Sequence, residues 1–264
     1  MKKASGIDGS RDWGLEKVYL HSTRQNLWNN DYFEFLVKCV WKIDKPVKII
    51  DFGCGYGYLA QMLLPLVPKE SLYKGVDISE DLIDEAREIF SGSKEVCFEV
   101  ADLNEYEPDA EYDIAICQAV LRHVTKPEDI MKKMIGAVKE NGLVICIELS
   151  RRMENAGIYI DSRIYDPFEN DEFLKQRWLS EEQSGGRDYQ VGMKTPVFME
   201  KLGLKNVGVR INDYVDFVSA GTDAFEAEQR RFIIDHGVDE KYADSNGYLA
   251  ARCHVISYGH KNDV

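Results

Sequence analysis

The chain has 264 residues, of which 44% are hydrophobic and 30% charged, proportions typical of a globular protein. It carries 33 Lys and Arg against 46 Asp and Glu, a net charge of −13 at pH 7. This excess of acid disfavours a protein that binds nucleic acid through its phosphates or docks on an anionic membrane, because both need basic side chains.

The termini and the cysteines suggest a cytoplasmic protein. The first residues, MKKASGIDGSRDW, have two lysines but no apolar run behind them, so we expect no secretory signal. No stretch approaches the ~18 apolar residues of a membrane-spanning helix. The six cysteines form no Cys-x-x-Cys pair and the five histidines show no metal-ligand spacing. We therefore expect mostly buried thiols and no metal site.

From residue 46 to residue 150 the sequence alternates between strand and helix patterns, after a first helix over residues 30–43. Apolar runs predict five strands, over residues 46–52, 72–78, 95–103, 112–120 and 143–150. Periodicity and capping signals predict the intervening helices, over residues 56–67, 79–90 and 126–142. Strands that are apolar throughout are typical of a parallel sheet buried on both faces.

After Ser150 the alternation stops. Residues 151 to about 192 are polar and aromatic with no obvious strand, so we expect an insertion of helices and loop. The alternation of helix and strand patterns then resumes, with helices predicted over residues 195–204 and 222–237 and strands over residues 205–215 and 251–261. The prediction is a doubly wound, mostly parallel seven-stranded α/β sheet. A helical N-terminal cap would span residues 1–45 and one large domain residues 46–264, with a separate second domain less expected.

The most informative segment is IIDFGCGYGYLA, residues 49–60, where glycines follow the first strand. Ligands bind at this place in such sheets, and glycine lets the backbone turn tightly and approach them. One candidate ligand is a dinucleotide, because Gly55, Gly57 and Ala60 match G-x-G-x-x-A and Asp77 follows about 20 residues later. The other is S-adenosylmethionine, for which Asp51 at the strand end would begin the motif.

Three features favour S-adenosylmethionine. An acid at position 51 suits a ligand that has no phosphate but carries an amino group and a sulfonium. A further acid, Asp102, ends the third strand and could accept from an exocyclic amine. Gln118 and His123 follow the fourth strand.

With these motifs the chain resembles class I S-adenosylmethionine-dependent methyltransferases, of the group similar to the ubiquinone/menaquinone C-methyltransferases. The resemblance covers about residues 46–150, and more weakly 194–218. It rests on VKIIDFGCGYGYLA, GVDIS, ADL, YDIAICQAVLRHV and MIGAVKENGLVICIE, in that order. The family's usual Pro-Gly-Gly turn is Glu140-Asn141-Gly142 here, a mild departure. The resemblance implies a Rossmann-like fold and S-adenosylmethionine as cofactor, with S-adenosylhomocysteine as product.

The resemblance also implies roles for single residues. Gly53, Cys54, Gly55 and Gln118 would lie against the methionine part, and Asp51 would face its amino group or instead cap the turn. Asp77 would accept from both ribose hydroxyls. The adenine would contact Ile78, Ala101, Asp102 and Leu103, with Asp102 accepting from its amino group.

His123 would be either a general base or a packing residue. In similar enzymes an N-terminal helix covers the cofactor. Arg24 could therefore pair with the methionine carboxylate, with Tyr19, Trp28 and Asn29 lining the cover, although a helix packed on the sheet is an equal alternative.

The acceptor would be chosen by that helix and by the insertion, whose cationic and aromatic residues are Arg151, Arg152, Tyr159, Tyr165, Phe168, Trp178 and Tyr189. They suggest an apolar or ring-bearing small molecule, with the arginines able to hold a carboxylate. We expect a small-molecule methyltransferase, a monomer or homodimer with no nucleic acid or membrane partner. The alternatives are an NAD-dependent oxidoreductase and a non-catalytic cofactor-binding protein.

Overall fold

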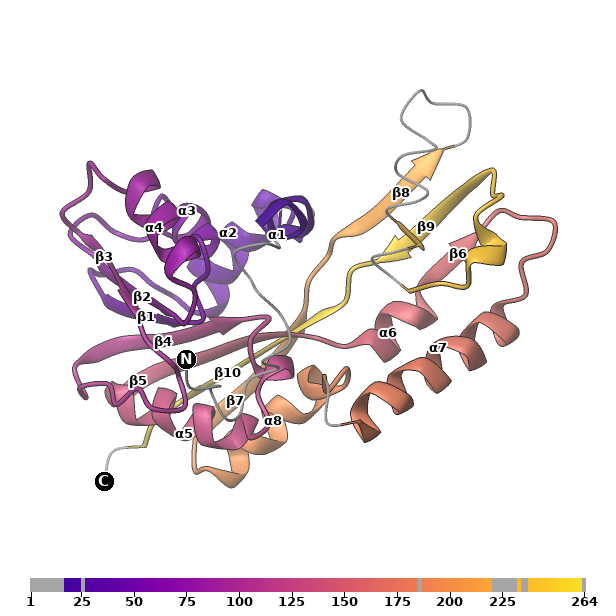
Figure 1. Cartoon of the computed structure of the whole chain (residues 1–264). Helices are drawn as coiled ribbons and strands as arrows, with labels where there is room; N and C mark the ends of the chain where they lie inside the picture. Colours follow the sequence, from indigo (N-terminus) through magenta and orange to yellow (C-terminus); the bar gives the residue numbers. More distant parts are fainter. Residues whose placement is uncertain (1–16, 25–26, 185–186, 220–231, 234–236, 263–264) are drawn as a thin grey trace.

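The computed structural model describes residues 17–24, 27–184, 187–219, 232–233 and 237–262. A large sheet carries helices on both faces, and a smaller sheet with its own long helix extends from one end of it (Figure 1). The predicted helix over 222–237 falls mostly outside the described residues. Within the described part of the chain, no helix is long and apolar enough to span a membrane.

The large sheet has seven strands in the order β3-β2-β1-β4-β5-β10-β7, which confirms the predicted sheet. Its strands are β1 (Lys48–Phe52), β2 (Leu72–Asp77), β3 (Val96–Val100), β4 (Tyr112–Gln118), β5 (Val138–Leu149), β7 (Lys205–Ile211) and β10 (His254–His260). The first five are parallel, and β10 is antiparallel to both β5 and β7. The strand order reverses between β1 and β4, so their following loops diverge and leave a crevice at that edge.

Adjacent residues of β1 point into two different cores, which is why the sheet is covered twice. Ile49 packs among the helices α2 (Asn30–Phe35), α3 (Tyr58–Leu63) and α4 (Glu80–Ile89). Ile50 packs on the opposite face, with residues of α5 (Pro127–Ala137) and α8 (Val191–Lys201). This is the two-residue period of a strand buried on both sides.

Two predicted helices end early. The helix after β1 ends at Leu63, two residues before Pro65, as the proline predicts. The helix predicted to reach residue 142 ends at Ala137 instead, and that part of the prediction was wrong. Val138 already pairs with Tyr112 and Leu143 with Ile114, in one parallel ladder. The residues between them, among them Asn141 with a φ of 61°, shift the register of the pairing. The Asn-Gly pair thus makes an irregularity inside β5 rather than a helix end.

The smaller sheet has the order β6-β9-β8 and is built from segments far apart in the sequence. It comprises β6 (Ile158–Ile160), β8 (Val215–Ser219) and β9 (Gly247–Ala251), beside α6 (Arg151–Ala156) and α7 (Pro167–Gln183). The expectation of no strand in the insertion was therefore wrong, because the three residues of β6 are too few to show a period.

Two strands predicted as single are each divided between the sheets. Residues 205–215 form β7 and then enter β8 after Asn212–Tyr214, and residues 251–261 divide at Arg252 and Cys253. The smaller sheet and α7 enclose an apolar cluster of their own, which includes Ile160, Leu174 and Tyr248.

Candidate active site

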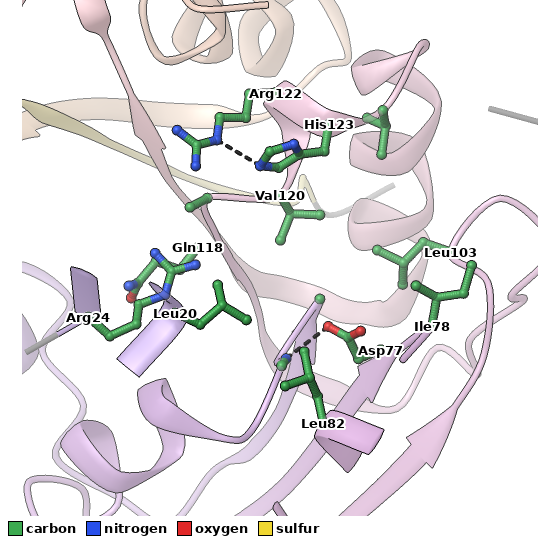
Figure 2. A pocket seen from close by; sticks show the side chains of 14 residues that line it. Leu20, Arg24, Asp77, Ile78, Leu82, Leu103, Gln118, Val120, Arg122 and His123 are labelled. Carbon is green, nitrogen blue, oxygen red and sulfur yellow. Dashed lines mark hydrogen bonds between the residues drawn. The ribbon is translucent and has the colours of Figure 1, made fainter. Parts of the chain in front are cut away.

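Two adjoining cavities open where the strand order reverses, beside α1 (Lys17–Arg24). The larger has about 750 Å³ of empty space, which includes solvent at its open side. Its lining residues are Leu20, Arg24, Gly53, Gly55, Asp77, Ile78, Leu82, Leu103, Gln118, Ala119, Val120, Arg122, His123 and Val124 (Figure 2). The smaller shares several of these and adds Asp51, Cys54, Tyr56, Tyr58 and Leu59.

The glycine loop follows β1 and folds back on β2. The amides of Gly53 and Cys54 both donate to the carbonyl of Val76, at 2.7 and 3.1 Å. Gly53 has φ +78°, and a Cβ on it would lie 2.4 Å from a methyl of Val120. Only glycine fits there, because the loop after β4 rests directly on the loop after β1.

Asp77 ends β2 and points into the larger cavity (Figure 2). Its carboxylate accepts from the amide of Gly55 at 2.8 Å and from that of Ser79 at 3.0 Å. Burial raises the pKa of Asp77, while the backbone N–H groups and the Arg24 cation oppose that shift. Each carboxylate oxygen has further lone pairs, so the group can accept from two ligand hydroxyls as well.

Asp51 is buried beneath the smaller cavity. Tyr73 donates its hydroxyl to one carboxylate oxygen, and the other oxygen has no hydrogen-bond partner among the described residues. Burial raises the pKa of Asp51 to about 7, against the Tyr73 hydrogen bond, which lowers it. A buried acceptor of this kind costs free energy unless a ligand donates to it.

Arg24 is the cation at the mouth, and it lines both cavities from the last turn of α1. It makes no hydrogen bond or ion pair with the residues the structure describes. Its charge acts on Asp51, Asp77 and the buried Glu148. In Figure 2 Arg24 and Gln118 both lie at the end of the cavity away from Ile78 and Leu103.

The loop after β4 supplies the remaining polar groups. Gln118 is buried and lines both cavities. The ring Nε2 of His123 accepts from Nε of Arg122 at 2.8 Å (Figure 2). That nitrogen therefore lacks a proton, and the hydrogen bond occupies its lone pair. A role as base at Nε2 would require Arg122 to move first.

Most of the predicted site residues come together. Arg24, Asp51, Gly53, Cys54, Gly55, Asp77, Ile78, Leu103, Gln118 and His123 line one or both cavities. Ala101 and Asp102 do not, although they precede Leu103 directly. Asp102 instead accepts from the backbone and side chain of Asn104, at 2.9 and 2.8 Å. Its contact with an adenine amine stays a prediction.

The residues predicted to form the cover and the acceptor site lie elsewhere. Trp28 is in the sheet core, Asn29 donates to Asp213, and the Tyr19 side chain lies outside what the structure describes. No residue of the insertion lines either described cavity. Arg151, which was expected to hold an acceptor carboxylate, instead pairs with buried Glu154 at 2.6 Å. Two aromatic residues of the insertion, Tyr165 and Trp178, pack against the apolar cluster of the smaller sheet.

Sequence reasoning missed Leu20, Leu82, Val120 and Arg122 as lining residues. Leu20 packs with Tyr56 and Leu82, joining α1 to the glycine loop and α4. Apolar residues of this kind carry no chemical signal, so only the fold identifies them. No group of acids, thiols and imidazoles in the described residues could hold a metal ion.

Chemically, the cavities offer an acid for hydroxyls at Asp77 and an apolar wall at Ile78 and Leu103. At the other end they offer an unsatisfied acid at Asp51 and a cation at Arg24. This order of groups matches a nucleoside that carries an amino acid. The donor set therefore fits S-adenosylmethionine. The amides of Gly53, Cys54 and Gly55, which a pyrophosphate would need, already donate to Val76 and Asp77.

Comparison with known proteins gives the same family. A family model described as "Methyltransferase domain" matches residues 43–190. A malonyl-[acyl-carrier protein] O-methyltransferase of Halalkalibacterium halodurans is 29% identical over 106 residues, 39% of each chain. A ubiquinone biosynthesis O-methyltransferase of Thiobacillus denitrificans is 29% identical over 111 residues, 41% of this chain and 47% of the relative. The match thus spans less than half of either relative's length.

Solved structures support the fold. A Haemonchus contortus phosphoethanolamine N-methyltransferase 2, in complex with phosphomonomethylethanolamine and S-adenosylhomocysteine, has a TM-score of 0.56. It is 14% identical, and the alignment covers 95% of this chain and 59% of that one. At this identity the likeness establishes the architecture and leaves the acceptor open.

Proposed function

Because the chain belongs to the methyltransferase-domain family, with residues 43–190 matched, we propose that it transfers a methyl group from S-adenosylmethionine to a small-molecule acceptor. The observation that carries the proposal is the order of charged groups along the cavities. The family and the fold both support S-adenosylmethionine as the cofactor.

In this proposal the protein binds the cofactor from both ends. The Asp77 carboxylate accepts from the two ribose hydroxyls, while Ile78 and Leu103 contact the adenine. The free oxygen of Asp51 accepts from the amino group, and Arg24 pairs with the carboxylate. Gln118 and the Gly53–Gly55 backbone contact the chain between them.

The cofactor supplies a methyl group already activated on a sulfonium, so the protein has mainly to orient the acceptor in line with it. The acceptor would enter beside Val120, Arg122 and His123, the part of the larger cavity not assigned to the cofactor. Leu20 and Leu82 add apolar lining on the side of α1 and α4. His123 would remove an acceptor proton only where the acceptor needs to lose one and Arg122 releases Nε2.

Isothermal titration calorimetry with S-adenosylhomocysteine, beside NADH, tests the proposal. We expect wild type to bind S-adenosylhomocysteine and Asp77→Ala to bind it about 2–3 kcal/mol more weakly, because hydrogen bonds to a charged acceptor are lost. Asp77→Asn is the matched control. It keeps one acceptor for the Gly55 amide and should fall between the two.

Binding of NADH without S-adenosylhomocysteine would refute the proposal and favour an oxidoreductase. Binding of S-adenosylhomocysteine with no methylated product in an acceptor screen using radiolabelled S-adenosylmethionine would favour a non-catalytic protein of this fold.

A further inference from the structure

Glu148 is a fully buried carboxylate on β5, outside the set of residues expected to bind the cofactor. One of its oxygens, Oε1, accepts from the backbone amides of Val120 and Leu121, both at 2.8 Å. The thiol of Cys117 lies 3.8 Å from the same oxygen. A carboxylate buried at this depth is costly unless it is well hydrogen-bonded, so its presence needs a reason.

The two amides belong to the loop that carries the acceptor side of the cavity. This loop follows β4, and its chain turns through Ala119, whose φ is 56°, an uncommon value for a residue with a side chain. The amide of Ala119 donates to the Ile147 carbonyl of β5 at 2.9 Å. The amides of residues 119, 120 and 121 thus all donate to two adjacent residues of β5, Ile147 and Glu148.

Holding these amides fixes what the loop presents. The Val120 side chain then rests over Gly53, where no Cβ could be accommodated. Gln118 precedes the held amides and lines both cavities, and Arg122 and His123 follow them in a short 3-10 turn, Leu121–His123. Without Glu148 the loop would have to keep its positive φ while the N–H groups of Val120 and Leu121 lost their acceptor.

We propose that Glu148 is a positioning residue that holds the loop after β4 in its cofactor-binding shape before the cofactor arrives. The inference rests on the proposed function, because the loop matters only if the amino-acid part of S-adenosylmethionine binds beside Gln118. Glu148 itself does not line either described cavity. Its effect on binding passes through the backbone of Val120 and Leu121.

The test compares two ligands on three variants. S-adenosylhomocysteine has the amino-acid part, whereas 5′-methylthioadenosine lacks it. In Glu148→Ala we expect S-adenosylhomocysteine to bind about tenfold more weakly, because two backbone donors of the loop lose their charged acceptor. We expect 5′-methylthioadenosine to bind nearly as in wild type. Glu148→Gln keeps an oxygen that can accept from both amides, so it should restore most of the lost affinity.

Ser71→Ala is the matched control, because the Ser71 hydroxyl accepts from the buried Val47 amide at 3.2 Å, where the chain enters β1 and β2. It orphans a buried amide at the opposite edge of the sheet, so it should lower the melting temperature without changing either affinity. Equal weakening of both ligands in Glu148→Ala, or no rescue by Gln, would overturn the inference.

Amide exchange of wild type, followed by NMR, keeps the inference testable if Glu148→Ala does not fold. The Val120 and Leu121 amides should exchange slowly in the ligand-free protein, and fast exchange there would also overturn the inference. Failure of wild type to bind S-adenosylhomocysteine is a different result, because it would refute the proposed function itself.

Discussion

The carboxyl of Asp51 changes charge near neutral pH, because burial raises its pKa from the ordinary 3.8 to about 7. The groups around it are the Tyr73 hydroxyl, which stays protonated, the Asp77 carboxylate and the Arg24 cation. A cofactor ammonium would bind the ionised form of Asp51 and stabilise it. Binding of the ligand should therefore be linked to loss of a proton from this one residue.

We predict that the affinity for S-adenosylhomocysteine rises as the pH increases from 5.5 and levels off above about 7. Below that pKa the slope should approach about tenfold per pH unit, the limit for release of one proton. Calorimetry across this range on wild type and Asp51→Asn checks it, since the variant cannot ionise and should show a flatter profile. An unchanged slope in Asp51→Asn would assign the proton to another group, such as Asp77.

The same shift has the opposite consequence for the stability of the ligand-free protein. The folded state holds the Asp51 proton more tightly than the unfolded state between about pH 4 and 7. The contribution of this group to the free energy of unfolding is thus fully present below about pH 4 and is lost as the pH rises through about 7. The cofactor would offset this loss by pairing with the ionised carboxylate.

For single residues, the sequence indicated which side chains could bind a ligand better than it indicated which groups those side chains contact. Asp51, Asp77 and the glycines are recognisable in the sequence because an acid or a glycine directly after an apolar strand is unusual and indicates a ligand or a tight turn. Asp102 shares that pattern, yet in the structure it accepts from Asn104, a local hydrogen bond that a sequence does not distinguish from a ligand contact. Glu148 was not identified, because one acid in an apolar strand does not reveal which amides it meets.

Among the elements, α1 is the one that covers the cavities. Leu20 and Arg24 line them. The same side of α1 also contacts α4, because Leu20 packs with Leu82. Glu85 of α4 pairs with Lys17 at 3.2 Å and with His21 at 2.6 Å, and the His21 ring stacks on Tyr56 at 4.1 Å. These pairs are partly exposed, so each contributes only ~0.2–1 kcal/mol.

We predict that S-adenosylhomocysteine slows amide hydrogen exchange in α1, since the ligand would add contacts to Leu20 and Arg24. Glu85→Gln should raise exchange in ligand-free α1 about two- to fivefold, because the ion pair with Lys17 is lost and the contact with His21 is weakened. Hydrogen-exchange mass spectrometry measures both effects, and α7, which contributes no residue to the two cavities of the candidate site, serves as the internal control. Unchanged exchange in α1 on ligand binding would show that α1 does not close over the site.

The sequence predicted helices and strands well where the apolar pattern runs over many residues. It predicted them poorly where the chain passes from one sheet to the other within a few residues. β7 and β8, like β9 and β10, are joined by only a few residues, so each pair looks like one strand in the sequence. The division depends on partners that lie far away along the chain, such as Ile158 beside Ala250. Local propensity does not contain that information.

Over the whole molecule, a buried ion pair lies at the passage between the two sheets. Arg252, between β9 and β10, donates to Asp216 of β8 at 3.0 Å, and both side chains are about nine-tenths buried. Arg252 also donates its amide to the Tyr214 carbonyl, at 3.0 Å, in the connection from β7 to β8. The two crossing segments are therefore joined where they leave the large sheet.

We predict that Asp216→Ala lowers the free energy of unfolding by about 3–5 kcal/mol, because it leaves a buried guanidinium without its carboxylate. The double variant Asp216→Leu with Arg252→Met should recover most of that loss, since neither charge then needs a partner. Scanning calorimetry measures both, and S-adenosylhomocysteine affinity should not change, because neither residue lines the described cavities. Equal loss in the single and double variants would mean that the pair is not what stabilises the junction.

The smaller sheet also constrains how such a chain could have been assembled over evolutionary time. β6 enters it from the segment after β5, whereas β8 and β9 enter it from the far end of the chain, where Ile211 and Val255 are still paired in the large sheet. An ancestor that gained only the first segment would have had a three-residue strand with no neighbour. One that gained only the second would have exposed Val218 and Tyr248, now in a common core with Ile160. The segment after β5 and residues 212–253 therefore depend on each other for burial, although nearly a hundred residues separate Ile158 from its partner Ala250.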